Sequence, residues 1–163
     1  MKPEGWKPWE EYQAGLPKKR MGAAVAIRDE DGKWLIVKPS YRDEWCLPGG
    51  VVDINESPMM TAKREVREET GLNLMVIILL VANYNSSEGN RDENIQWFFD
   101  GGVVTENQKT EISIDGDEIM EAKFVDDGEF YELCGERWGH KLELIKQALK
   151  TGAMYTENYE KIV

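Results

Sequence analysis

The chain has 163 residues, of which 41% are hydrophobic, and its formal net charge at pH 7 is −11. This length and composition are typical of one soluble globular domain with an ordinary core. The acidic balance disfavours binding to nucleic acid, because the protein would repel the phosphate backbone. It does not exclude a phosphate-bearing small molecule, since divalent cations can neutralise such a site.

Neither a membrane span nor a secretory signal is predicted. The longest apolar run, LMVIILLVA at Leu74–Ala82, is much shorter than the roughly 20 residues that cross a bilayer. The N-terminal sequence MKPEGWKPWEEYQ lacks the apolar segment of a signal peptide. Cys46 and Cys134 fit neither a disulfide framework nor a CxxC metal site. We interpret them as free thiols and expect a cytoplasmic protein.

Residues 1–19 are predicted to form an irregular N-terminal arm, followed by a domain at residues 20–163. The arm contains three prolines and interleaves Trp6, Trp9 and Tyr12. We expect it to pack on the domain or on a second subunit, so a homodimer is one possibility. A contribution of these aromatic residues to base stacking is the alternative.

The first half of the domain is predicted to contain a hairpin and a helix. Apolar runs at Met21–Ile27 and Trp34–Val37 flank the turn sequence DEDGK, which favours a β-hairpin. The segment EWCLPGGVVD supplies two short strand-like pieces. Ser57 is a good N-cap, Pro58 suits the first helical position, and Gly71 suits the end of a helix. A helix is therefore expected over Pro58–Thr70.

The second half is predicted to contain strands and then a helix. Strands are expected at about Leu72–Tyr84, Asn94–Val104 and Glu118–Asp126, and the segments Asn85–Glu93 and Thr105–Asp117 are interpreted as connectors. A helix at about Glu136–Lys150 carries an apolar stripe of Trp138, Leu142, Ile145 and Leu149. The last residues form a tail of unclear structure. This order favours an α/β fold with helices on both faces of a mixed sheet.

The helix at Pro58–Thr70 places three acids where negative charge is unfavourable. At about 100° per residue, Glu69 falls on the same stripe as Ala62 and Val66, and Glu65 lies on its border. Glu65 and Glu69 repel each other at i,i+4, carboxylates in the last turn oppose the helix dipole, and burial adds a desolvation cost. A solvated face of salt bridges would keep its acids away from the apolar stripe.

A hard divalent cation would remove these penalties. Mg²⁺ and Mn²⁺ prefer carboxylate oxygens and bridge to substrate phosphates, and acids at i, i+3 and i+4 can converge on one site. The pattern therefore predicts a metal-binding edge on this helix. The single histidine, His140, makes a histidine-rich zinc site or a histidine-based triad a poor candidate, and we interpret it as a surface or packing residue.

The same stretch resembles the Nudix box. Gly50 is followed after five residues by Glu56 and after seven more by REVREETGL, from Arg64 to Leu72, which matches every fixed position. The preceding WCLPGG is also typical of the family. The resemblance is to the MutT-like Nudix hydrolase family, and it implies a Nudix α/β/α sandwich with a mixed β-sheet.

The resemblance also implies roles for residues in the box. Glu68 and Glu69 would be the main ligands of Mg²⁺ or Mn²⁺, and Glu65 would be a further ligand or the group that activates water. Arg64 would hold the glutamates in place, together with Glu56. The backbone carbonyl of Gly49 or Gly50 could complete the coordination.

The implied activity is hydrolysis of a nucleoside diphosphate linked to another moiety, by attack of water at phosphorus. The substrate would be a nucleoside triphosphate or a derivative such as ADP-ribose or a sugar nucleotide. A catalytically silent Nudix-like sensor of nucleotides is the main alternative, but such modules typically lose the acids that this box retains. An acidic interaction protein without a metal site would require Glu69 to lie on the apolar stripe by accident.

Residues outside the box are candidates for further contacts. Glu118 or Glu121 could supply an additional acid, with Glu88 and Glu93 as alternatives. Arg28, Lys38, Tyr41 and Arg42 are candidate contacts for phosphate, and Trp45, Tyr84 or Trp97 could contact a base. In the strand NIQWFFDGGVV, Ile95, Trp97 and Phe99 share one face and Gln96 and Phe98 the other, so at most one of these large aromatic residues is available for stacking.

Overall fold

The structure is a computed structural model, which describes residues 5–75, 77–114 and 116–161. Its elements follow in the order α1 (Trp9–Ala14), β1 (Arg20–Asp29), β2 (Trp34–Pro39), β3 (Gly49–Val51), α2 (Pro58–Thr70), β4 (Ile78–Asn85), β5 (Asn94–Val104), α3 (Glu106–Lys109), β6 (Ile119–Val125), α4 (Asp127–Thr151), β7 (Met154–Glu157) and β8 (Glu160–Lys161). None of these helices has the length and apolar character that a membrane crossing requires.

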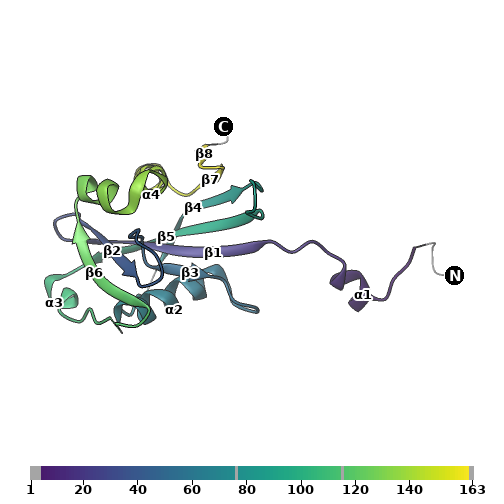
Figure 1. The fold of residues 1–163 in the computed structure, drawn as a ribbon, viewed down its shortest axis with the longest axis horizontal. Coiled ribbons are helices and arrows are strands. Elements are labelled where there is room, and N and C mark those ends of the chain that lie inside the picture. The colour runs from purple at the N-terminus through teal and green to yellow at the C-terminus, as the bar shows by residue number, and fades with distance from the viewer. Residues whose placement is uncertain (1–4, 76, 115, 162–163) are drawn as a thin grey trace.

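The strands form one mixed sheet with helices on both faces (Figure 1). Its order is β6-β2-β1-β5-β4-β7-β8, and β3 pairs with β1. The β1–β5 and β4–β7 pairs are parallel, whereas the other pairs are antiparallel. Helix α2 covers one face and α4 the other, so the predicted α/β/α sandwich is confirmed.

Alternation along the central strand creates the two cores. Ala23, Val25 and Ile27 of β1 belong to the core with α2, whereas Ala24 and Ala26 belong to the core with α4. Successive side chains of a strand point to opposite faces, so a strand covered on both sides must be apolar throughout. The same alternation places Trp97 and Phe99 toward α2 and Phe98 toward α4, as the pattern of β5 predicts.

The predicted hairpin and the helix at Pro58–Thr70 are confirmed, but the start of one strand differs. The strand expected from Leu72 begins only at Ile78. Leu72 and Ile77 are nevertheless buried in the core with α2, so the start of this apolar run packs in the core without pairing in the sheet. Val76 lies outside the described residues.

Helix α4 consists of two helical pieces that meet at Gly135, whose φ of 75° and ψ of 173° are not helical. The piece after Gly135 confirms the helix predicted from Glu136. The piece that begins at Asp127 was not predicted, and Asp126 caps it by accepting a hydrogen bond from the Glu129 amide.

Further elements appear in segments predicted to be irregular. Helix α3 interrupts the Thr105–Asp117 connector, where Thr105 and Gln108 form a capping box. The C-terminal tail contributes β7, which extends the sheet beside β4. The arm contains the short helix α1 and is therefore not wholly irregular. All of residues 5–20 are exposed, and α1 lies apart from the sheet (Figure 1). Cys46 and Cys134 are free, as predicted, and both are buried.

Candidate active site

Helix α2 is held at both ends by its predicted caps. The Ser57 hydroxyl accepts a hydrogen bond from the Met60 amide, and Gly71 ends the helix in the left-handed conformation at φ 75°. Ala62, Val66 and Glu69 are buried, as the helical spacing predicts. A glutamate therefore lies in the apolar interface between α2 and the sheet.

Glu69 connects α2 to the Gly49–Gly50 turn. Its Oε2 accepts a hydrogen bond of 2.8 Å from the Gly49 amide, and the residue is only 6% exposed. Burial is the main cause that raises the pKa of Glu69 to about 8, and the nearby carboxylates of Glu65 and Glu118 act in the same direction. A cation bound at this position would relieve that unfavourable burial of negative charge.

Arg64 holds three of the box carboxylates. Its guanidinium donates to Glu56 through Nε and Nη2 at 3.1 and 2.9 Å, and through Nη1 to Glu65 at 2.8 Å and to Glu68 at 3.0 Å. The planar guanidinium can contact several carboxylates at once, which an ammonium does less well. The expected pairing with Glu56 and Glu68 is thus present, and Glu65 joins it.

The carboxyls around Arg64 differ in their ionisation. Hydrogen bonds from Arg64 and from the Thr61 hydroxyl lower the pKa of Glu56 to about 2, so Glu56 is a permanent anion that anchors the arginine. Burial raises the pKa of Glu65 despite its contact with Arg64. A half-buried carboxylate with a raised pKa is a better proton acceptor than an exposed one.

Close contacts leave no room for a side chain at either glycine of the turn. A Cβ on Gly49 would lie 2.2 Å from the Ala23 carbonyl oxygen, and Gly49 has a φ of 149°. A Cβ on Gly50 would lie 2.3 Å from Glu65 Oε1. The backbone of β3 and the Glu65 carboxylate therefore approach each other directly.

Of the acids predicted outside the box, Glu118 is the one that faces this site. Its charge acts on Glu65, Glu69 and Tyr41, raising the pKa of each. Glu121 lies in register with Lys38 on the β2–β6 ladder. Glu93 accepts a hydrogen bond of 2.6 Å from Tyr84 and pairs with Lys19, while the Glu88 backbone forms a bridge with Arg91. No contact of Glu88, Glu93 or Glu121 with the box acids is present among the described residues.

The donor chemistry of the site fits a hard divalent cation. Glu65, Glu68, Glu69 and Glu118 offer only oxygen atoms, and the buried Glu69 lacks a cation in direct contact among the described residues. Across residues 5–75, 77–114 and 116–161, no three acidic, histidine or cysteine side chains are already close enough together to hold a metal. Arg64 draws Glu65 and Glu68 toward itself, so ion binding would compete with those contacts.

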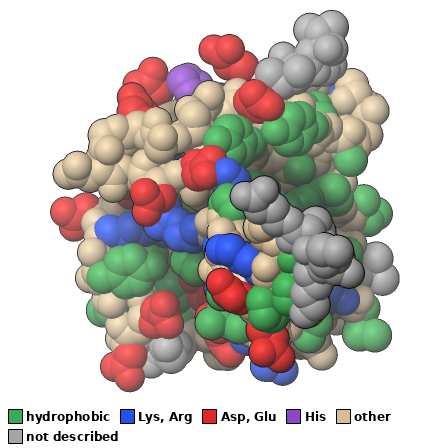
Figure 2. Space-filling model, turned by 90° about the vertical axis from the view of Figure 1, so that its right-hand side faces the viewer, with side chains coloured by type: hydrophobic (Ala, Val, Ile, Leu, Met, Phe, Trp, Pro, Cys, Tyr) green, Lys and Arg blue, Asp and Glu red, His purple; other side chains and the backbone are tan. Residues whose placement is uncertain are grey.

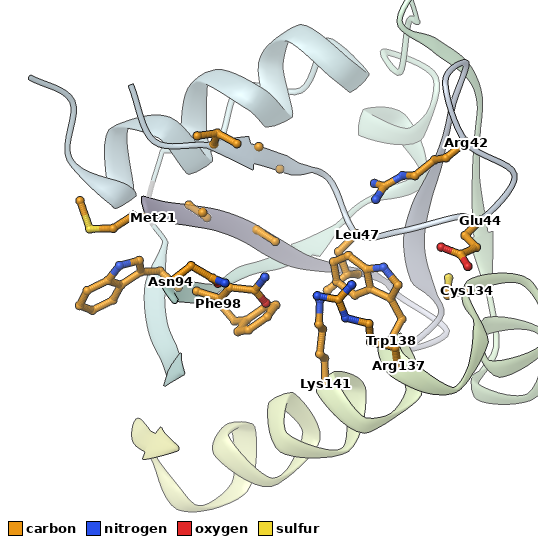
Figure 3. Close-up of a pocket in the computed structure, with 18 of the residues that line it drawn as sticks. Met21, Arg42, Glu44, Leu47, Asn94, Phe98, Cys134, Arg137, Trp138 and Lys141 are labelled. Carbon is orange, nitrogen blue, oxygen red and sulfur yellow. The ribbon is translucent and has the colours of Figure 1, made fainter. Parts of the chain in front are cut away.

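A cavity of about 460 Å³ adjoins the turn and runs between the sheet and α4 (Figure 3). Tyr41 and Arg42 line it together with Gly49 and Gly50, and so does Trp97. The face in Figure 2 carries a row of Lys and Arg side chains across its middle. The cavity itself is lined by Arg20, Arg42, Arg91, Arg137 and Lys141, and such a basic lining in an acidic protein suits a phosphate-bearing ligand.

Other predicted substrate contacts lie away from this cavity. Arg28 pairs with Asp100 at 2.8 Å, and Lys38 donates to the Asp43 carbonyl. Trp45 is buried in the core with α4, and Tyr84 is occupied by Glu93. His140 is exposed on α4, as predicted.

Helix α4 contributes Arg137, Trp138 and Lys141 to the lining of the cavity. None of these contacts was predicted from the sequence, in which Trp138 was only part of an apolar stripe. Arg20 and Arg91 were missed as well. The one available signal was the spacing of Trp138 and Lys141 at i,i+3, which places the lysine on the face of the tryptophan.

Comparisons with known proteins agree with this architecture. The model of the NUDIX domain matches residues 18–146, so the chain belongs to the NUDIX family. A MutT-like protein of Streptomyces ambofaciens is 39% identical over 67 residues, covering 41% of this chain and 43% of the relative. An ADP-ribose pyrophosphatase of Bacillus subtilis is 34% identical over 103 residues, covering 61% of this chain and 54% of the relative. The matches thus span about half the length of these relatives.

Solved structures share the fold at lower identity. The MutT protein of Methanosarcina mazei Go1 superposes with a TM-score of 0.63 at 23% identity, covering 84% of this chain and 98% of that chain. The NUDIX domain of Shewanella oneidensis NrtR, solved with ADP ribose, gives a TM-score of 0.67 at 20% identity, covering 89% and 99%.

Proposed function

We propose that this protein is a Mg²⁺- or Mn²⁺-dependent pyrophosphohydrolase that cleaves a nucleoside diphosphate linked to another moiety. The observation that carries the proposal is the position of Glu69: a buried carboxylate, repelled by Glu65 and Glu118, that accepts a hydrogen bond from Gly49, which lines a cavity with several cations. Its relatives include proteins described as a putative 8-oxo-dGTP diphosphatase and an ADP-ribose pyrophosphatase, which supports the same reaction class.

The box residues have distinct parts in this proposal. Glu65, Glu68 and Glu69 would hold the metal, with the Gly49 carbonyl as a further ligand and Glu118 as the additional acid. The bound ion would neutralise the charge on the attacking and leaving oxygens. Arg64 and Glu56 keep the glutamates in place through the hydrogen bonds described above. Glu65 is either one of these metal ligands or the base that takes a proton from water, because its carboxylate lies against the backbone of Gly50.

The cavity supports a nucleotide-type small molecule as the substrate. Arg42 and Tyr41 are placed beside the Gly49–Gly50 turn, where they can position phosphates. Trp97 offers an aromatic side chain in the same cavity for a base. Nucleoside triphosphates, ADP-ribose and sugar nucleotides all combine these features.

The direct test is release of phosphate or mononucleotide with Mg²⁺ and with EDTA. The panel would contain nucleoside triphosphates, ADP-ribose, sugar nucleotides, coenzyme A and dinucleoside polyphosphates. Turnover that requires the metal supports the proposal and gives the substrate class. Absence of turnover in protein that still binds both metal and nucleotide would overturn it in favour of a sensor.

We also propose that the N-terminal arm serves a homodimer. Trp9 and Tyr12 are 66% and 50% exposed and stack on each other with ring centroids 5.7 Å apart. Exposed aromatic pairs of this kind are typical of protein interfaces. The molar mass in solution, with and without the arm, tests this proposal.

A further inference from the structure

Lys141 is a buried lysine in the wall of the cavity. It extends from α4 toward the sheet beside Arg137 and Trp138, while Arg42 approaches from the loop on the other side (Figure 3). The residue is only 4% exposed. An ammonium is rarely buried to this extent without an anionic partner, because its desolvation is costly.

The surroundings of Lys141 are aromatic and cationic. Its Nζ lies 3.8 Å from the centroid of the Trp138 ring, 5.5 Å from that of Tyr159 and 5.8 Å from that of Phe98. No hydrogen bond or ion pair of Lys141 is present within the described part of the chain. Cation–π contacts replace only part of the lost hydration, and burial together with the charges of Arg137 and Arg42 lowers the pKa of Lys141 to about 7.

The cavity as a whole has more cationic than acidic side chains in its lining. Five cationic residues line it, but only two acidic ones, Glu44 and Glu136. Arg42 Nε, from another lining residue, is a buried nitrogen without a hydrogen-bond partner among the described residues. A cavity of this kind is complementary to a ligand that is rich in acceptors and negative charge.

Lys141 is separate from the place where the diphosphate would be cleaved. The acids of α2 lie on one face of the sheet, whereas Lys141 extends from α4 on the other. Of the neighbouring charges, that of Arg137 acts most on Lys141, whereas that of Arg42 acts on both Lys141 and Glu69. A group bound by Lys141 and Arg137 is therefore on the α4 side of the sheet, and Arg42 is shared with the side of the acids.

We infer that Lys141, with Arg137, binds a second anionic group of the substrate, separate from the diphosphate that is hydrolysed. The group is a phosphate monoester or a carboxylate, both of which accept hydrogen bonds from ammonium and guanidinium. This inference rests on the proposed function and narrows its substrates to those with such a remote anion. Trp138 contributes by holding the ammonium against its ring.

Three pairs of compounds test the inference, each pair differing in one remote anionic group. UDP-glucose and UDP-glucuronic acid differ in a carboxylate, whereas dephospho-coenzyme A and coenzyme A, and NADH and NADPH, differ in a phosphate monoester. Affinity is measured in EDTA by calorimetry, so that binding is observed without hydrolysis. Turnover with Mg²⁺ is measured in parallel.

The wild-type protein should bind the anionic member of at least one pair about tenfold or more tightly than its partner. Lys141→Met should abolish this ratio, whereas Lys141→Arg should retain it. The matched control is Lys150→Met, at an exposed lysine of the same helix, which should behave as the wild type. A preference confined to the sugar-nucleotide pair identifies a carboxylate, and one confined to the other pairs identifies a phosphate.

Two results would overturn the inference: equal affinity within every pair, or a ratio that Lys141→Met leaves unchanged. Thermal unfolding of each variant separates loss of the fold from loss of the site. Failure of the proposed function is distinguishable, because it appears as lack of Mg²⁺-dependent turnover while the affinity ratio in EDTA is preserved.

Discussion

Gly50 and Glu65 are in such close contact that a methyl group on Gly50 would lie 2.3 Å from the Glu65 Oε1 atom. The neighbouring Gly49 is restricted differently, since its added Cβ would lie 2.2 Å from a backbone oxygen, that of Ala23, at a φ of 149°. A side-chain carboxylate can move away, but the backbone of a central strand cannot. Substitution of the two glycines should therefore have different effects on activity and stability.

Gly50→Ala should displace the Glu65 carboxylate and lower turnover by at least about tenfold, while the protein remains folded. Gly49→Ala should destabilise the domain by about 3 kcal/mol or more, because both the contact and the backbone conformation are unfavourable. Chemical denaturation and steady-state kinetics distinguish the two outcomes. Equal loss of stability in both variants would contradict this assignment.

Glu68→Gln should lower turnover at least about 100-fold if Glu68 holds the metal. Its side chain is about half exposed, so the fold should be unaffected. The variant should also keep or slightly raise the melting temperature of the metal-free protein, because it reduces repulsion among the acids. Glu132→Gln, at an exposed site on α4, is the control. Unchanged turnover in Glu68→Gln would refute the role.

Arg64→Lys should lower activity by about tenfold or more although the charge is conserved. One ammonium cannot reproduce the hydrogen bonds that the guanidinium makes to Glu56, Glu65 and Glu68. The apparent affinity for Mg²⁺, measured by calorimetry, should fall with the activity. Wild-type kinetics in this variant would show that positive charge alone is sufficient.

Glu69 should make the metal-free protein less stable as the pH rises. Its pKa is about 8 in the folded state, above the ordinary value of 4.5, so the folded protein binds more protons than the unfolded chain between these values. Stability is therefore greatest below the unfolded pKa and decreases from about pH 4.5 to 8, by an amount on the order of a few kcal/mol.

Glu69→Gln should remove most of this pH dependence, and urea denaturation in EDTA from pH 5 to 8 measures it. Added Mg²⁺ should stabilise the wild type most at the upper end of that range, since the ion binds the ionised carboxylate. Parallel stability curves for the wild type and Glu69→Gln would contradict the buried-charge explanation.

Removal of residues 1–17 should leave the melting temperature within about 2 °C of the full chain, because residues 5–17 are exposed and contribute little to the core. If the arm serves a homodimer, the same truncation should convert a dimer into a monomer in light scattering. A truncated protein that remains dimeric would place the interface elsewhere.

The sequence by itself determined the features that depend only on residues close together in the chain, namely the bounds of α2 and the faces of α2 and β5. The spacing of Ala62, Val66 and Glu69 on one helix, with caps at Ser57 and Gly71, predicted the buried acid and the bounds of α2. Alternation on β5 predicted which face each aromatic residue occupies. Both patterns follow from the fixed periodicity of the backbone.

Only the tertiary structure decided which distant residues meet. It selected Glu118 over Glu121 as the acid beside α2, and it brought Arg137 and Lys141 from α4 to the cavity that Gly49 and Gly50 also line. It also added a helical piece between Asp127 and the break at Gly135, which the apolar stripe after Glu136 did not predict. Helical and strand periods give the direction of a side chain within its own element, whereas the approach of two elements depends on the packing of the whole core.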